Sequence, residues 1–133
     1  MNIVYHDDVE ISVEMAIGLY RKTSLGERRP VGRPDIFEGM FKNASLTISA
    51  WDGDRLVGIS RSLTDFVYVA YLADLVVDAD YQRRGIGRRL VQETGKRLGR
   101  GCMIVLFSAP KAHEYYPKLG FESNPFGWVL RDS

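Results

Sequence analysis

The stretch that decides the fold runs from Tyr71 to Leu90 and has the sequence YLADLVVDADYQRRGIGRRL. Residues 71–77 are an apolar run that predicts a strand, and residues 85–98 show the helical spacing of apolar side chains. Glycines at a helix entrance admit positive φ and let a ligand approach closely, while a helix N-terminus offers unpaired N–H groups to an anion. Strand, glycine loop and helix therefore predict a phosphate site, surrounded by the cations Arg83, Arg84, Arg88 and Arg89.

Three kinds of phosphate-binding loop compete for this pattern. A Walker A loop requires Gly-Lys-Ser/Thr after the glycines, and the sequence has none there. A Rossmann fingerprint requires a third glycine where Leu90 stands and an acidic residue about 20 positions further on, where apolar Val105–Phe107 lie. The third form, Gln/Arg-x-x-Gly-x-Gly/Ala, is matched by Gln82, Gly85 and Gly87. For this stretch alone, a helix entrance with exposed arginines is the competing interpretation.

A second block of sequence favours the third form. Residues 112–121 have the sequence AHEYYPKLGF. Together the two blocks resemble the pyrophosphate loop and the C-terminal motif A-x-x-F-Y-x-K-L-G-F of the GCN5-related N-acetyltransferase (GNAT) family, with Tyr115 in place of the phenylalanine. The resemblance covers the second half of the chain, and the first half matches only in its pattern of elements. It implies that residues 1–133 form a single acyl-CoA N-acyltransferase domain.

The other patterns predict an α/β fold with a GNAT-like mixed, mostly antiparallel sheet and helices on both faces. Ser12 and Asp35 are candidate N-caps of two helices. Asp52-Gly53-Asp54 lies between two apolar runs and predicts a hairpin turn. Strands are expected at residues 2–6, 46–51, 56–62 and 67–77.

Two further elements are expected near the C-terminus. Met103–Phe107 is a continuous apolar run, which is typical of a strand buried on both faces. Because a helix precedes it, this strand should form one parallel pair with the strand before the glycine loop. Phe121–Arg131 predicts a final hairpin that turns at residues 124–127.

The resemblance implies a binding site for acetyl-CoA, the acetyl donor, with coenzyme A as product. The pantetheine arm would pair with the backbone of Leu75, Val76 and Val77. The pyrophosphate would lie on the loop residues Gln82, Arg83, Arg84, Gly85, Ile86, Gly87 and Arg88. Tyr116 would be the general acid that protonates the departing thiolate, since a phenol with a reference pKa of about 10 is protonated at neutral pH. Packing on a short helix is the alternative for Tyr116, and its neighbour Tyr115 is expected in the core.

The general base has no clear candidate in the sequence. Many members of the family carry a glutamate on the strand before the loop, and Ala73 stands at that position. Asp74 is next to it, but strand alternation places its side chain on the opposite face. Tyr71, Asp65 and His113 stay open as alternatives, as does a mechanism in which the acceptor arrives neutral.

Composition narrows the class of protein. The chain has 133 residues, 45% of them hydrophobic, and a formal net charge of +1, which gives no reason to expect a nucleic-acid partner. No Cys/His/Asp cluster has metal-ligand spacing, and no apolar stretch is long enough to span a membrane. The single cysteine, Cys102, and an N-terminus unlike a signal peptide lead us to expect a cytoplasmic protein.

The function expected from these patterns is transfer of an acetyl group to a primary amine, by direct attack in a ternary complex. A small-molecule acceptor is favoured, and a protein lysine or N-terminal acetyltransferase is the alternative. An acyl-CoA-binding regulatory module without turnover also stays open, because of Ala73. Arg28, Arg29 and Arg33 are candidates for binding an anionic acceptor, with a solvated loop as the other interpretation. The aromatic segment around Trp128 would support a homodimer.

Overall fold

The computed structural model describes residues 2–132, and within them five strands form one sheet in the order β1-β2-β3-β4-β5. The strands are β1 (Ile3–His6), β2 (Leu46–Asp52), β3 (Arg55–Thr64), β4 (Val69–Val77) and β5 (Met103–Val105). All neighbouring strands are antiparallel except β4 and β5, which are parallel. The mixed, mostly antiparallel sheet predicted from the sequence is confirmed.

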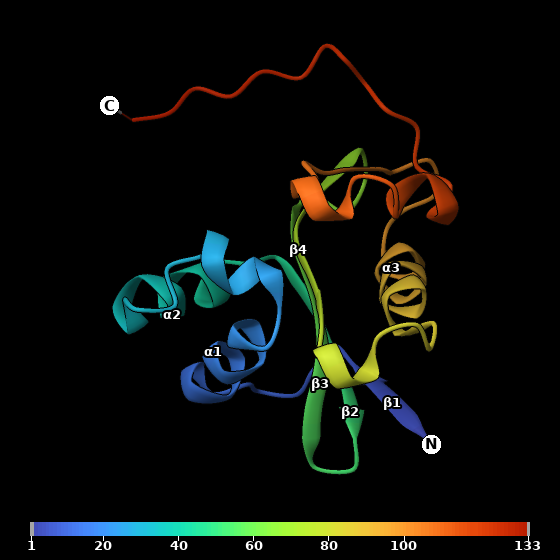
Figure 1. Cartoon of the computed structure of the whole chain (residues 1–133). Helices are drawn as coiled ribbons and strands as arrows, with labels where there is room; N and C mark the ends of the chain where they lie inside the picture. The colour runs from blue at the N-terminus through green and yellow to red at the C-terminus, as the bar shows by residue number, and fades with distance from the viewer. Residues whose placement is uncertain (1, 133) are drawn as a thin grey trace.

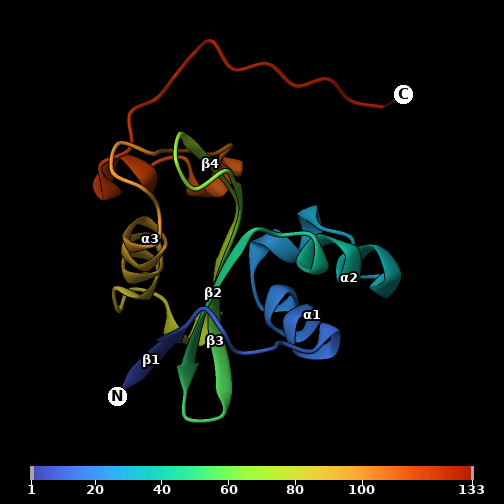
Figure 2. The ribbon, with the colours of Figure 1, turned by 180° about the vertical axis from the view of Figure 1, so that it is seen from behind.

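Helices cover both faces of this sheet, as expected. Helices α1 (Val13–Arg21) and α2 (Pro34–Lys42) lie on one face, and α3 (Ile86–Lys96) lies on the other (Figures 1 and 2). Short 3-10 helices connect these elements: η1 (Ser24–Arg28), η2 (Ala79–Tyr81), η3 (Pro110–Ala112) and η4 (Tyr116–Leu119). No helix within residues 2–132 is long and apolar enough to cross a membrane.

The two predicted helix caps have different outcomes. The hydroxyl of Ser12 accepts a hydrogen bond from the backbone N–H of Met15 at 3.1 Å, so Ser12 caps α1 as predicted. Asp35 lies inside α2 and is not its cap. The helix begins at Pro34, because proline presets the helical φ and lacks the N–H that the first turn cannot pair.

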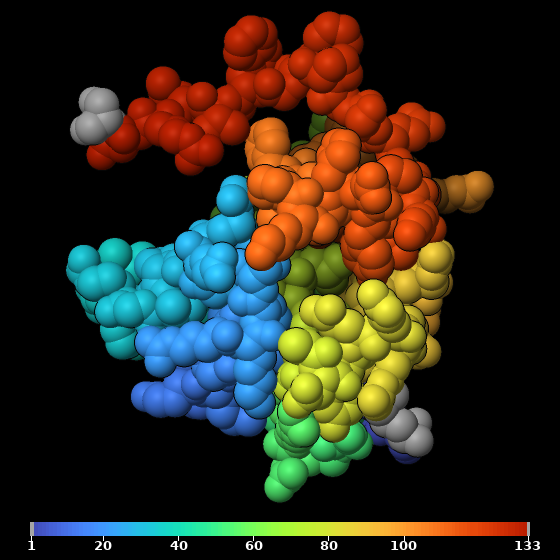
Figure 3. All heavy atoms as spheres, viewed as in Figure 1, coloured from blue at the N-terminus to red at the C-terminus, as the bar shows by residue number. Residues whose placement is uncertain are grey.

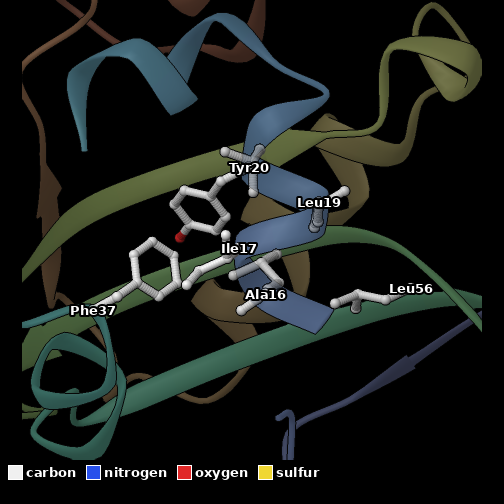
Figure 4. Packing of buried hydrophobic residues seen from close by; sticks show 8 residues of the cluster. Ala16, Ile17, Leu19, Tyr20, Phe37 and Leu56 are labelled. Carbon is white, nitrogen blue, oxygen red and sulfur yellow. The ribbon is translucent and has the colours of Figure 1, made fainter. Parts of the chain in front are cut away.

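A separate apolar core fills each side of the sheet. Between the sheet and α1 and α2, the rings of Tyr20 and Phe37 are fully buried and meet edge to face, with their centroids 4.9 Å apart (Figure 4). On the other face, Leu90 of α3 is fully buried against the sheet. A Cβ added at Gly58 of β3 would lie 3.0 Å from the Leu90 side chain, so this glycine lets α3 approach closely.

The expectation that β5 would be buried on both faces is wrong. The side chains of Met103 and Val105 are 46% and 43% exposed. Met103 and Val105 lie on the same face of the sheet, because side chains alternate along a strand. This face is left uncovered at β5, which ends the strand order. An apolar run looks the same in sequence whether its strand is central or at an edge.

The predicted C-terminal hairpin is also absent. Residues 121–131 contain a turn at 125–126 and no strand. A two-stranded hairpin needs a third strand or a packed face to be stable in water, and Trp128 here is 90% exposed. The segment instead extends away from the domain (Figure 1).

Candidate active site

The site begins with a break in the pairing of β4. Asp74 pairs with Arg61 and Leu72 pairs with Ser62, so Ala73 has no partner on β3 and forms a β-bulge. Bulges bend a strand. On the other side of β4, pairing with β5 covers only residues 69–71. Within residues 2–132, no strand therefore pairs with the outer side of β4 at residues 75–77, and its backbone groups face a space between β4 and β5.

A cavity of about 900 Å³ occupies this space. Figure 3 shows β4 in olive at the bottom of a hollow between α1 and η1, the glycine loop and η3. A volume of this size is typical of small-molecule and cofactor sites, which range over about 300–1,000 Å³. Of the residues predicted to bind acetyl-CoA or act on it, the lining includes Leu75, Val76, Val77, Gln82, Arg83, Gly85, Ile86, Gly87, Arg88 and Tyr116.

Arg84 is the predicted loop residue that does not line the cavity. Its guanidinium carbon lies 5.1 Å from the ring centroid of Tyr81, and that of Arg55 lies 4.9 Å from the same ring. The Tyr81 hydroxyl donates a hydrogen bond to Asp52 at 2.6 Å. Arg84 thus covers the side chain that anchors the loop to the β2–β3 turn.

The loop backbone is held in an unusual conformation. Arg83 and Gly85 have φ of +64° and +81°. The left-handed conformation costs a residue with a side chain roughly 1–2 kcal/mol. Such strain collects at functional sites, where the surroundings maintain it. Here it turns the chain into α3, so that the first residues of the helix, Ile86, Gly87 and Arg88, line the cavity. The first N–H groups of a helix have no partner within the helix.

Asp78 fixes the other end of the loop. Its carboxylate accepts a hydrogen bond from the Asp80 backbone N–H at 2.9 Å and another from Arg55 at 3.0 Å. The ammonium of Lys22, at the end of α1, lies 3.6 Å away. Burial disfavours the charge of Asp78, but these partners hold its pKa below the usual value. The loop is therefore tied to both β3 and α1.

The bulge in β4 is held by a buried carboxylate. Asp74 accepts hydrogen bonds from the Tyr20 hydroxyl at 2.7 Å and from the Nε atoms of Arg29 and Arg61, each at 2.6 Å. Burial opposes the charge of Asp74. The hydrogen bonds and charge of Arg61, the Tyr20 hydroxyl and the charge of Arg29 outweigh it and hold the pKa of Asp74 below its usual range. Asp74 is fully engaged and is not a free base.

Arg29 connects the bulge to the wall of the cavity. The sequence alone did not predict this connection. Its Nη2 donates to the carbonyl of Ala73 at 2.8 Å, and its Nη1 donates to the carbonyl of Arg28 at 2.9 Å. Arg29 therefore holds η1 against β4 and helps form the cavity. Two features of the sequence hinted at this contact: the arginine-rich loop that contains Arg29, and an acidic residue, Asp74, within an apolar strand. Their pairing could not be predicted, because the two residues are far apart in the chain.

Tyr116, at the start of η4, also lines the cavity. Its ring is half-buried, with centroids 5.5 Å from Tyr115 and 5.6 Å from Phe121. Burial raises the pKa of Tyr116, so its hydroxyl keeps its proton at neutral pH. The expectation that Tyr115 lies in the core is wrong: it is 37% exposed and lines the same cavity. A Cβ at Gly87 would collide with the Tyr115 hydroxyl, so this glycine makes room for the tyrosine.

The other candidates for the base lie outside the cavity lining. Asp65 accepts hydrogen bonds from the N–H groups of Val67, Tyr68 and Val69, at 3.0, 2.8 and 3.2 Å, and so stabilises a turn. Tyr71 and His113 do not line the cavity. Among the residues described, Glu27 of η1 is the one acidic residue in the lining. No motif in the sequence marks Glu27 as a site residue.

Two of the three arginines considered for an anionic acceptor lie outside the cavity lining. Arg33 pairs with Asp35 at 3.0 Å on the surface and does not line the cavity, and neither does Arg28. Within residues 2–132, no group of three or more His, Cys, Asp or Glu residues is arranged to hold a metal ion.

Comparison with known proteins identifies the class to which this fold and cavity belong. The family model described as "Acetyltransferase (GNAT) domain" matches residues 43–123, which is more than half of the chain. The chain belongs to the GNAT acetyltransferase family. It is 30% identical over 131 residues to an uncharacterized N-acetyltransferase, ycf52, of Porphyra purpurea, covering 90% of this chain and 74% of the relative. The chain spans only 30–38% of the length of some plant relatives.

Solved structures of similar fold cover the chain from end to end. A probable acetyltransferase from methicillin-resistant Staphylococcus aureus superposes with a TM-score of 0.79 at 20% identity, covering 99% of each chain. AAC(6')-Iy, solved in complex with the bisubstrate analog CoA-S-monomethyl-acetylneamine, superposes with a TM-score of 0.72 at 16% identity, covering 100% of this chain and 99% of the other. At these identities, the likeness establishes the fold.

The buried carboxylate yields the first testable prediction. Asp74→Asn leaves Arg61 buried without its counter-charge, and we expect it to lower the free energy of unfolding by about 3–5 kcal/mol. In the parent protein the folded-state pKa of Asp74 lies below its unfolded value of about 3.9. Its contribution is therefore present above that pH and is lost as the pH falls through the folded-state pKa. Urea unfolding at several pH values measures both effects.

The matched control is Asp35→Asn, which removes a carboxylate from an exposed arginine pair. We expect it to leave the free energy of unfolding almost unchanged, because water screens the charges of an exposed pair. Equal losses in the two variants would contradict a special role for the buried carboxylate.

Proposed function

We propose that the protein transfers an acetyl group from acetyl-CoA to a primary amine, by direct attack in a ternary complex, and that the acceptor is a small molecule. The observation that supports this most strongly is the convergence on one cavity of three parts: the side of β4 that faces away from β3 at residues 75–77, a helix N-terminus and the half-buried Tyr116. These three parts hold a thioester arm, bind a pyrophosphate and supply a proton.

The lining is chemically suited to a coenzyme A derivative. The backbone of Leu75, Val76 and Val77 offers hydrogen bonds to the amides of the pantetheine arm. The N-terminus of α3 favours a phosphate group through its unpaired N–H groups and its dipole, and Arg83 and Arg88 add cations at the same end of the cavity. AAC(6')-Iy, which has the same fold, was solved in complex with a bisubstrate analog that contains CoA, and this supports a coenzyme A derivative as the ligand.

The chemistry assigned to this chain is proton transfer and positioning. Acetyl-CoA supplies an activated acyl group; the acceptor nitrogen forms a bond to the acyl carbon while the bond from carbon to sulfur breaks. The hydroxyl of Tyr116 donates its proton to the departing thiolate. The excess proton on the acceptor nitrogen passes to solvent or to a cavity base, and Tyr116 is reprotonated from solvent. Arg29 and Asp74 act as positioning residues, because they hold the bulge of β4 in place.

A small acceptor is favoured by the shape of the site. The part of the cavity that would hold the acceptor is lined by residues of η1 and by Phe107. Protein bounds the cavity on several sides (Figure 3). Glu27 contributes a negative charge to a lining that is otherwise rich in cations. We propose that Glu27 attracts the ammonium group of the acceptor.

The variant Tyr116→Phe tests whether the protein is an enzyme or a binding module without turnover. The second possibility is suggested by Ala73, which stands at the bulge where many members of the family carry a glutamate. Removing a general acid typically costs about 10²- to 10⁴-fold in rate. We expect kcat to fall by that amount while the dissociation constant of acetyl-CoA stays within about twofold, because the hydroxyl acts on the leaving group. Steady-state kinetics with a panel of amines and calorimetry with acetyl-CoA provide the two readouts.

Tyr115→Phe is the matched control, since it removes a hydroxyl from the same cavity wall. It should keep kcat within about threefold, because its hydroxyl lies against Gly87 rather than serving the reaction. If the parent protein showed no turnover with any amine, or if both variants lost activity equally, the assignment of Tyr116 would be wrong.

Glu27→Gln tests the proposed attraction of the acceptor. Because Glu27 is exposed, its charge is screened by water, and we expect KM for a cationic acceptor to rise about three- to tenfold with kcat little changed. Glu38→Gln, a neutralised carboxylate on α2 outside this cavity, should leave KM unchanged. A KM that responds equally to both changes would indicate an effect of overall charge alone.

A further inference from the structure

The buried cluster around Asp74 carries more positive than negative charge. The carboxylate of Asp74 accepts hydrogen bonds from two arginines, Arg29 and Arg61, each at 2.6 Å. Its third partner, the hydroxyl of Tyr20, stays neutral, because burial and the charge of Asp74 raise the pKa of Tyr20 well above its usual value. Two cations and one anion leave the cluster with a net positive charge.

Arg29 is the member of the cluster that faces the cavity. Its side chain lines the cavity and is 23% exposed, whereas Asp74 is fully buried, and neither Asp74 nor Arg61 belongs to the lining. A charge acts more strongly in a site of limited solvent access than it does in water. A ligand in this part of the cavity therefore meets the positive side of the cluster.

The bulge at Ala73 is where the reacting end of the donor would lie. With the pyrophosphate on the glycine loop and the pantetheine arm along Val77 to Leu75, the arm runs toward Ala73. There, Nη2 of Arg29 lies 2.8 Å from the carbonyl oxygen of Ala73. Burial raises the pKa of Tyr116 and the charge of Arg29 opposes this rise, so the two groups lie within electrostatic range of each other. Arg29 thus borders the place where the acceptor would attack.

We propose that Arg29 takes the place of the missing general base through electrostatic repulsion, which drives the bound acceptor ammonium to release a proton to solvent before the amine attacks. Like charges at short range disfavour each other, and the group that can lose its proton does so. Arginine keeps its proton in proteins, so the acceptor is the group that titrates. This role accounts for Ala73, which stands where many members of the family carry a glutamate. It rests on the acetyl transfer proposed above.

The protons of the reaction balance without a base from the protein. The acceptor ammonium releases its first proton to solvent when it binds beside Arg29. The neutral nitrogen then forms its bond to the acyl carbon while the bond from carbon to sulfur breaks, and the nitrogen loses a second proton to solvent. Tyr116 protonates the departing thiolate and recovers a proton from solvent.

The charges around Arg29 stay constant near neutral pH. Tyr20 of α1, Arg61 of β3, Asp74 of β4 and Tyr116 of η4 lie within its electrostatic range, and Glu27 of η1 and Lys111 of η3 line the same cavity. The raised pKa values of the two tyrosines keep them neutral, and the lowered pKa of Asp74 keeps it charged. Glu27 and Lys111 are exposed, so water screens their charges. A change in rate near neutral pH therefore reports on the acceptor.

The pH dependence of kcat tests this assignment, because it reports the ionisation of the enzyme–substrate complex. The acceptor is the primary amine with the highest turnover in the panel described above. In the parent protein we expect kcat to rise with pH, with a midpoint about one unit or more below the pKa of the free amine. Arg29→Gln removes the charge and should move the midpoint up to the pKa of the free amine, whereas Arg29→Lys keeps the charge and should retain the parent midpoint.

Arg28→Gln is the matched control, because it removes the same charge one residue earlier from a side chain outside the cavity lining. It should leave the midpoint unchanged. A role of Arg29 in positioning alone would lower kcat equally at every pH without moving the midpoint. That result, or a parent midpoint at or above the pKa of the free amine, would overturn the proposal.

Proton release on binding gives a second readout, which needs no turnover. Calorimetric titration of the panel amines into the protein with coenzyme A bound, in buffers of different ionisation enthalpy, counts the protons released. At about one pH unit below the pKa of the free amine, we expect release of about 0.4 protons or more for the parent and Arg28→Gln, and almost none for Arg29→Gln. Proton release without turnover would contradict the proposed acetyl transfer and leave the effect of Arg29 standing. Turnover without proton release would contradict the role of Arg29 alone.

Discussion

The site depends on the charge of Asp74, which is buried in the middle of β4. A carboxylate without solvent must be paired, and Asp74 is paired by residues from α1, the loop after η1 and β3. The same contacts hold the bulge at Ala73, since Arg29 reaches both the Asp74 carboxylate and the Ala73 carbonyl. Pairing between β4 and β5 ends at Tyr71, just before the bulge, and the cavity lies beyond that point along β4. The polar cluster therefore lies where the two strands cease to pair.

The second half of the chain was largely predictable because its signals are local. The glycine loop, the spacing of α3 and the parallel pair follow from neighbouring residues, and the structure confirms that fold. The predicted loop and strand residues were found together in one cavity, with Arg84 as the exception. Their roles in binding acetyl-CoA stay a prediction.

What the sequence could not supply were contacts between distant residues. The residues next to Asp74 in the sequence do not indicate that Arg29 and Tyr20 are its partners. Glu27 joins the lining of the cavity only because η1 lies against β4 in the fold. The burial of β5 was predicted wrongly, because an apolar run has the same composition in an edge strand as in a central strand. The final hairpin was misjudged because alternating apolar residues predict a strand without saying which strand will pair with it.

Calorimetric titration shows whether the cavity between β4 and the glycine loop binds acetyl-CoA. We expect saturable binding of one acetyl-CoA per chain in preference to NAD and ATP. We also expect at least tenfold weaker binding in Arg83→Gln, whose side chain lines the cavity, than in Arg84→Gln, whose side chain covers Tyr81. Absence of binding by the folded protein, or an equal loss in the two variants, would contradict binding of acetyl-CoA in this cavity.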